Sequence, residues 1–210
     1  MIWKTEAFNG ALLPLIAILR GITPHEVEAH VEVLIAAGFN AIEIPLNSPD
    51  WQNSIANMVE KYGKSTLIGG GTVLTPENVD VLAGIGSKLV VTPNTSPAVI
   101  RRAVEYGMTV CAGCATASEA FTALEAGAQG LKIFPSSAFG PEYIKALKAV
   151  LPPEVPVFAV GGVTPDNLHQ YLTAGCVGAG LGGDLYRAGQ PVSRTAQQAS
   201  AFIKAFKDAQ

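Results

Sequence analysis

Residues 66–86 read TLIGGGTVLTPENVDVLAGIG, and the unit within them recurs along the chain. The apolar run at 66–72 predicts a buried strand. Thr75 and Pro76 predict the start of a helix, because Thr is a good N-cap and Pro is favoured at the first helical position. The glycines at 84–86 predict where that helix ends. The stretch therefore indicates a strand followed, after a short connection, by a helix.

The same unit of strand and helix is expected eight times. The predicted strands are short apolar runs, and they lie at 15–21, 41–45, 66–72, 88–93, 108–111, 130–136, 156–162 and 177–182. The predicted helices follow them at 23–38, 48–63, 75–86, 96–107, 116–127, 141–150, 164–175 and 194–209. Thr116 and Glu119 have the spacing of a capping box at the start of the fifth helix.

This alternation predicts the fold. Strands that alternate with helices form βαβ units with parallel strands. Eight units in 210 residues favour an α/β fold, a closed (β/α)8 TIM barrel. We expect one domain over 1–210, with a short N-terminal extension before the first strand lying against the outside or bottom of the barrel. The alternative is an open doubly wound sheet, but residues 20–23 (RGIT) lack its Gly-rich phosphate turn.

Composition limits the partners and the location. Charged residues make up 15% of the chain, against about 25% in typical domains, which predicts a large buried area and subunit contacts. The net charge is -3 and no basic cluster occurs, so we expect no nucleic acid partner. No apolar run approaches the ~18 residues of a membrane span, and residues 1–6 lack the apolar core of a signal peptide. Three cysteines argue against a disulfide framework, so a cytoplasmic location is expected.

Lys132 lies in the middle of the predicted strand at 130–136, GLKIFPS. A charged ammonium is costly to bury, so such a lysine can lower its pKa and become a neutral nucleophile that condenses with a carbonyl. A lysine paired with a carboxylate, or one whose head reaches solvent at the strand end, would fit the same strand. The strand alone leaves these interpretations open.

The second predicted strand carries a carboxylate, Glu43. Barrel active sites lie at the C-terminal ends of the strands, where the polar residues of this chain gather: Arg20, Glu43, Asn47, Thr72, Thr92, Asn94, Lys132 and Ser136. Alternate strands contribute to the same interior layer, so Glu43 and Lys132 are expected to face each other. The alternative is a buried salt bridge with no chemical role. Such a pair contributes little to stability, because desolvation offsets its attraction, so we favour a functional pair.

Two glycine pairs follow the seventh and eighth predicted strands. Gly161-Gly162 and Gly182-Gly183 allow backbone N–H groups to approach an anion, and barrel enzymes often bind phosphate with these two loops and a short helix. Residues 184–186 are expected to form that helix. The alternative is that the glycines only permit tight turns; their position in the chain favours phosphate binding.

Cysteine and histidine give no metal-site pattern. Cys111 and Cys114 form a lone C-x-x-C without a second ligand pair, and we interpret them as small core residues. His25, His30 and His169 fall on predicted outer helices and are expected at the surface.

Several motifs together resemble the pyruvate-dependent class I aldolases of the Entner–Doudoroff type, and within them the galactonate-type members. The similarity runs from about Leu12 to the C-terminus, through the motifs EIPLNSP (43–49), GGGTVL (69–74), VTPN (91–94), LKIFPS (131–136) and AVGGV (159–163). The resemblance implies a (β/α)8 barrel with no metal or cofactor, usually a homotrimer. It also implies reversible cleavage of a 2-dehydro-3-deoxy sugar acid phosphate to pyruvate and D-glyceraldehyde 3-phosphate, in galactonate catabolism.

The resemblance also implies roles for single residues. Lys132 would form the Schiff base, and Glu43 would be the general acid/base, acting through water. The remaining substrate-binding positions would be Arg20, Thr72 and Pro93 at the pyruvate end, Phe134 beside the lysine, Val160 near C4, and Gly161, Gly162, Gly182 and Gly183 at the phosphate. The chain departs from the family at Gly183, where Ser is usual, and at Val160, where gluconate-type members carry Thr.

Two other functions fit part of the pattern. One is a phosphate-binding barrel isomerase or epimerase, in which Glu43 removes a proton and Lys132 acts only through its charge. The other is a barrel that binds a sugar phosphate without turnover. Trapping with borohydride and pyruvate distinguishes the first from an aldolase, because only an imine is reduced to a stable adduct.

Overall fold

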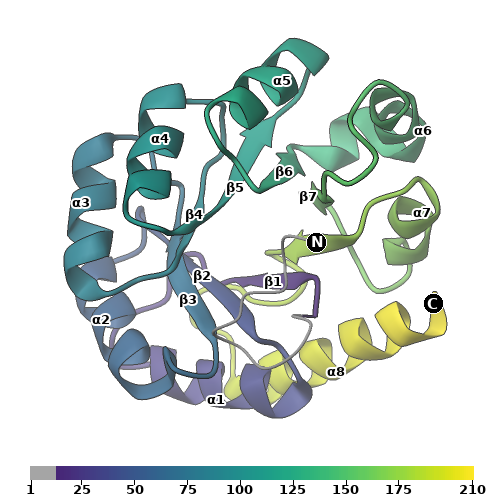
Figure 1. Cartoon of the computed structure of the whole chain (residues 1–210). Coiled ribbons are helices and arrows are strands. Elements are labelled where there is room, and N and C mark those ends of the chain that lie inside the picture. Colours follow the sequence, from purple (N-terminus) through teal and green to yellow (C-terminus); the bar gives the residue numbers. More distant parts are fainter. Residues whose placement is uncertain (1–12) are drawn as a thin grey trace.

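The computed structural model describes residues 13–210, and within them the predicted TIM barrel is confirmed. Eight parallel strands pair in the order β1-β2-β3-β4-β5-β6-β7-β8, and β1 pairs with β8 to close the barrel. Figure 1 shows the helices as a ring outside the strands, with α8 beside α1. The predicted N-terminal extension lies outside the described residues.

The strands and helices have the following bounds. The strands are β1 Leu15–Ile18, β2 Ala41–Pro45, β3 Leu67–Gly71, β4 Leu89–Val91, β5 Thr109–Cys114, β6 Gly130–Ile133, β7 Val157–Val160 and β8 Gly178–Leu181. The helices are α1 Val27–Ala37, α2 Trp51–Tyr62, α3 Pro76–Ile85, α4 Pro97–Glu105, α5 Ala117–Glu125, α6 Ser136–Lys148, α7 Leu168–Thr173 and α8 Val192–Asp208.

Local capping explains why several helices begin and end as predicted. The Thr75 side chain accepts a hydrogen bond from the Asn78 N–H at the start of α3, and Gly86 ends the helix with φ 85°. At the start of α5, Thr116 and Glu119 form the predicted capping box.

Several predicted boundaries are wrong. Strands β1 and β6 end at 18 and 133 rather than at 21 and 136, and helices α1 and α7 begin at 27 and 168 rather than at 23 and 164. Helix α6 begins at Ser136 rather than at 141, because a first turn precedes a kink at Gly140, whose φ is 79° and ψ 168°. Strand β5 extends to Cys114 rather than ending at 111, because Gly113 and Cys114 continue the pairing with β6. In the last two cases the predicted element stops short of a glycine, Gly140 or Gly113, that lies inside the element in the structure.

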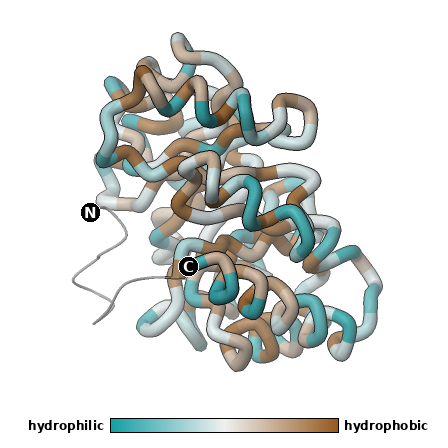
Figure 2. The backbone as a smooth tube through the Cα atoms, turned by 90° about the vertical axis from the view of Figure 1, so that its right-hand side faces the viewer, coloured by the Kyte–Doolittle hydropathy of each residue, from teal (hydrophilic) through white to brown (hydrophobic). Residues whose placement is uncertain are grey.

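The apolar residues form two cores. One lies inside the barrel and includes Ile16, Ile18, Leu67, Cys111, Phe158 and Val160; the larger one lies between the barrel and the helices. Figure 2 shows hydrophobic and hydrophilic residues alternating along the chain, as expected when one face of each helix packs on the strands. Within residues 13–210, no helix has the length and apolar character needed to cross a membrane.

Candidate active site

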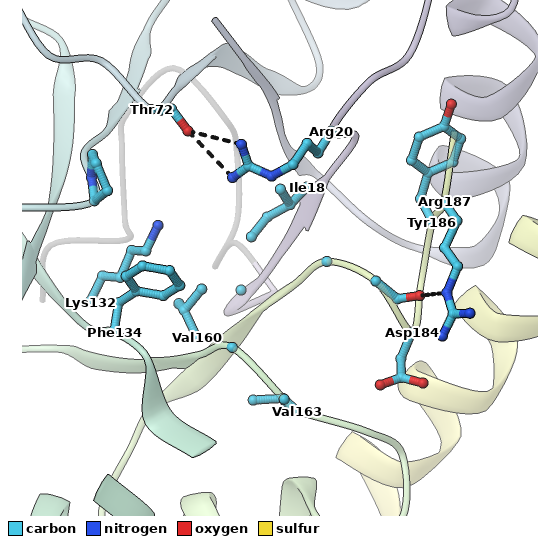
Figure 3. A pocket seen from close by; sticks show the side chains of 16 residues that line it. Ile18, Arg20, Thr72, Lys132, Phe134, Val160, Val163, Asp184, Tyr186 and Arg187 are labelled. Carbon is cyan, nitrogen blue, oxygen red and sulfur yellow. Dashed lines mark hydrogen bonds between the residues drawn. The ribbon is translucent and has the colours of Figure 1, made fainter. Parts of the chain in front are cut away.

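A cavity of about 770 Å³ opens where the C-terminal ends of the strands meet (Figure 3). Ten of the eleven predicted site residues line it: Arg20, Thr72, Pro93, Lys132, Phe134, Val160, Gly161, Gly162, Gly182 and Gly183. Glu43, the eleventh, is not on the cavity wall. Its carboxyl group lies against Gly71, which directly precedes the cavity-lining residue Thr72.

Lys132 projects from β6 into the barrel and is only 4% exposed. Burial lowers the pKa of its ammonium group, and nearby Arg20 lowers it further, while Glu43 and Cys111 oppose the shift. Its Nζ lies 4.8 Å from the centroid of the Phe134 ring. The side chain is therefore held at the cavity wall in an environment that favours the neutral amine.

Glu43 projects from β2 and is 1% exposed. Burial raises its pKa from 4.5 to about 7, against the attraction of Lys132 and Arg20. Its Oε2 accepts no hydrogen bond from the described residues, and no ion pair in that part of the chain joins it to Lys132. A carboxyl group with a pKa near neutrality can exchange protons at physiological pH.

The glycine run of β3 makes room for this carboxylate. A Cβ atom at Gly71 would overlap the Glu43 carboxyl group, and one at Gly69 would overlap the Leu89 carbonyl. The run that predicts the third strand therefore has a second role, because only glycine permits the carboxyl group to lie against the strand.

Arg20, Asn47 and Thr72 meet at one end of the cavity. Arg20 Nη1 donates to Asn47 Oδ1 at 2.7 Å, and both of its terminal nitrogens lie 3.4 Å from Thr72 Oγ1. Thr72 has a φ of 53°, which is costly for a β-branched residue. This strained backbone places a hydroxyl and a guanidinium side by side, a suitable arrangement for binding a carboxylate.

The two glycine pairs border the other part of the cavity. Gly161 and Gly162 have φ values of 96° and 72°, and a Cβ at Gly162 would lie 2.6 Å from the Ser137 Cβ. Both features require glycine there. A Cβ at Gly182 or Gly183 would meet no atom within 4 Å. The helix predicted at 184–186 is wrong: the Leu185 and Tyr186 N–H groups both bond to the Gly182 carbonyl, which makes a single turn.

Comparison with known proteins agrees with this geometry. Residues 9–198 match the aldolase family described as KDPG and KHG aldolase. The chain belongs to this family.

A curated relative and two solved structures have high similarity to this chain. The 2-dehydro-3-deoxy-6-phosphogalactonate aldolase of Escherichia coli (strain K12) is 69% identical over 209 residues, which are 100% of this chain and 99% of the relative. A solved structure described as native KDPGal is 69% identical, with a TM-score of 0.95, and the match covers 100% of this chain and 98% of that one.

A designed protein is also similar. It is a cube-shaped, highly porous cage made by fusing symmetric oligomeric domains. One of its chains is 72% identical over 94% of this chain and 73% of its own length, with a TM-score of 0.93.

Some of the polar residues predicted at the strand ends hydrogen-bond to the backbone of the aldolase barrel and do not line its cavity. Thr92 Oγ1 donates to the Asn94 carbonyl at 2.7 Å and accepts from the Gly113 N–H at 3.0 Å. Ser136 Oγ donates to the Ile133 carbonyl at 2.7 Å. Both hydroxyl groups are fully buried, so they satisfy backbone groups where strands end.

Six further residues line the cavity. Asp184 and Tyr186 lie in the stretch predicted as a phosphate-binding helix, whereas Ile18, Val163, Gly180 and Arg187 were not predicted. Ile18 and Gly180 stand two residues before predicted site residues, so the period-2 alternation of a strand could have found them. Val163 directly follows a glycine pair. Arg187 gave no signal, because its position depends on how the turn after β8 folds.

His30 is not at the surface as predicted. It is 2% exposed, and its Nδ1 lies 2.8 Å from Thr195 Oγ1. His25 and His169 are exposed, as expected. The three cysteines are buried and free, and burial raises the pKa of Cys111 to about 12, which is consistent with inert core residues. Among residues 13–210, no group of three or more His, Cys, Asp or Glu side chains could hold a metal ion.

Proposed function

We propose that this protein is a class I aldolase that cleaves 2-dehydro-3-deoxy-6-phospho-D-galactonate to pyruvate and D-glyceraldehyde 3-phosphate in galactonate catabolism. The observation that carries the proposal is Lys132, an amine 4% exposed on the wall of the cavity, with its pKa lowered by burial. Its relatives in the KDPG and KHG aldolase family, one of them named for this substrate, support the choice of reaction and substrate.

Lys132 is the nucleophile in this proposal. Its neutral amine adds to the C2 carbonyl of the substrate, and the carbinolamine loses water to give a protonated imine. The imine withdraws electrons, so the C3–C4 bond can break as the C4 hydroxyl loses its proton. The bonding electrons form an enamine, and D-glyceraldehyde 3-phosphate leaves. Protonation of the enamine at C3 and hydrolysis of the imine release pyruvate and regenerate the lysine.

Glu43 moves the protons in this sequence. Its pKa of about 7 lets it both give and take protons at physiological pH. Because its carboxyl group lies behind the cavity wall, beside Gly71, it acts through a water molecule rather than by direct contact with the substrate.

The remaining residues bind the two ends of the substrate. Arg20 and Thr72 bind the carboxylate of the pyruvate half, Pro93 lines the same end, and Phe134 lies beside Lys132. The glycine pairs after β7 and β8 bind the phosphate through their backbone N–H groups. Val160, 5% exposed on the cavity wall, lies near C4.

The working protein is a cytoplasmic homotrimer in this proposal. Symmetric oligomeric domains were used to build the cage that contains a 72% identical chain, which supports a symmetric oligomer. Free buried cysteines fit a reducing compartment. Light scattering on a sizing column would give the mass; a monomer at micromolar concentration would contradict the trimer.

Borohydride trapping tests the reaction. Wild type incubated with pyruvate and sodium borohydride should gain one stable adduct, mapped by mass spectrometry to the peptide that contains Lys132. Lys132→Ala should lose the adduct and all cleavage activity, measured by coupling pyruvate to lactate dehydrogenase, and keep its circular dichroism spectrum. Lys88→Ala, an exposed control, should behave as wild type. An adduct on Lys88 or Lys145 instead would refute the assignment.

A further inference from the structure

One side chain holds the peptide that follows each glycine pair. In the β7 loop, Asn167 Nδ2 donates to the Gly162 carbonyl at 2.9 Å. In the β8 loop, Arg187 Nε donates to the Gly183 carbonyl at 2.8 Å, as drawn in Figure 3. In both loops the acceptor is the carbonyl of the second glycine, and only the donor residue differs.

These two hydrogen bonds determine where the next N–H group points. A trans peptide is planar, so its N–H points opposite to its carbonyl. The N–H groups of Val163 and Asp184 therefore point away from Asn167 and from the Arg187 Nε. Val163 and Asp184 both line the cavity, and neither N–H donates to a protein acceptor within residues 13–210.

A neighbouring bond in the β8 loop has a different consequence. Gln198 Nε2 donates to the Asp184 carbonyl at 2.7 Å, so it also holds one peptide of this loop. The N–H of that peptide belongs to Leu185 and already donates to the Gly182 carbonyl at 2.8 Å. Gln198 therefore stabilises the turn without directing a free donor into the cavity.

Building on the proposed function, we propose that Asn167 and Arg187 are positioning residues for the substrate phosphate. Each holds one peptide so that a free N–H, that of Val163 or of Asp184, donates to a phosphate oxygen. A donor bound to the carbonyl polarises the peptide and strengthens its N–H as a donor. The Arg187 cation does this most strongly, in the loop where Gly183 lacks a side-chain hydroxyl.

The test compares aldehydes with and without phosphate. In the aldol direction, with pyruvate saturating, Asn167→Ala and Arg187→Lys should raise KM for D-glyceraldehyde 3-phosphate about tenfold, a change of about 1.4 kcal/mol. KM for D-glyceraldehyde should stay unchanged. Arg187→Lys keeps the positive charge but loses the Nε–H. Wild-type KM in that variant would show that charge alone suffices and would overturn the assignment of Arg187.

Gln198→Ala is the matched control, because it removes a bond of the same kind from the same loop. It should leave both KM values unchanged. A rise in KM for the phosphorylated aldehyde equal to that of Arg187→Lys would mean that any loosening of the loop has this effect, and would overturn the proposal. An equal rise for both aldehydes in Asn167→Ala would do the same.

Two further measurements separate this proposal from the proposed function. Binding of inorganic phosphate, measured by calorimetry, should weaken about tenfold in Asn167→Ala and Arg187→Lys and requires no turnover; unchanged binding overturns the proposal. Borohydride trapping at Lys132 should persist in every variant; its absence in wild type refutes the aldolase and leaves the phosphate test valid. If Asn167→Ala does not fold, Asn167→Asp replaces it, because its carboxylate can still accept from the Thr164 N–H, a bond of 2.8 Å.

Discussion

Replacing Glu43 by Gln tests the protonation state on which the proposed chemistry depends. The substitution exchanges a buried carboxyl group for a neutral amide of nearly the same shape. Burial raises the Glu43 pKa from 4.5 to about 7. The native protein therefore binds more protons than the unfolded chain between these two values, and its stability falls as the pH rises through them.

The size of the effect follows from the same pKa. The difference between 4.5 and about 7 corresponds to about 3 kcal/mol, since one pKa unit is worth about 1.36 kcal/mol. Wild type has the full contribution below about pH 4.5 and has lost it above about pH 7. Glu43→Gln does not titrate. As the pH rises from about 4.5 to about 7, the free energy of unfolding of the Gln variant minus that of wild type should therefore increase by about 3 kcal/mol.

The assay is urea denaturation between about pH 4.5 and about pH 8 at one protein concentration. Glu142→Gln, an exposed control on α6, should follow wild type at every pH. A buried ion pair with Lys132 would give the opposite sign, because the Gln variant would then lose stability relative to wild type as the pH rises. That result, or a difference independent of pH, would refute the reasoning.

Three further substitutions test the site. Gly71→Ala should displace the Glu43 carboxyl group, lower kcat and destabilise the fold by about 1–3 kcal/mol. The control Gly70→Ala, whose new Cβ meets only flexible Leu side chains, should keep the wild-type kcat. Equal kcat values in the two variants would contradict this prediction. Gly183→Ser, whose Cβ enters open space, should tighten phosphate binding by about 0.5–1.5 kcal/mol, and a higher KM for the phosphorylated substrate would count against it. Val160→Thr should shift kcat/KM toward the gluco epimer by about 1–2 kcal/mol, and an unchanged ratio would mean that position 160 does not read C4.

The fold could be predicted because its signals are local. Apolar runs, Thr-Pro starts and glycine stops each lie within a few residues of the element that they mark. The failures occurred where local signals conflict with the tertiary structure. Pro141 is a typical helix start, yet α6 begins at Ser136, whose hydroxyl bonds to the Ile133 carbonyl in the preceding strand.

Residues whose role depends on distant partners could not be predicted. His30 is buried because Thr195, which is 165 positions away, accepts or donates a hydrogen bond at its ring nitrogen. Arg187 and Asn167 act on carbonyl groups whose direction depends on the turns after β7 and β8. Ten of the predicted site residues line the cavity because the strand ends converge, which the topology alone implies.

The placement of Glu43 explains how one barrel can hold a basic and an acidic group in reactive forms. A direct ion pair would keep Lys132 protonated and Glu43 ionised, and neither form suits imine formation followed by proton transfer. No ion pair joins them in the described part of the chain, so burial dominates both pKa values, lowering that of the lysine and raising that of the carboxyl group. Gly71 provides the space that keeps the carboxyl group against β3. In the proposed mechanism, the glycine run of this strand therefore supports the acid–base chemistry as well as the fold.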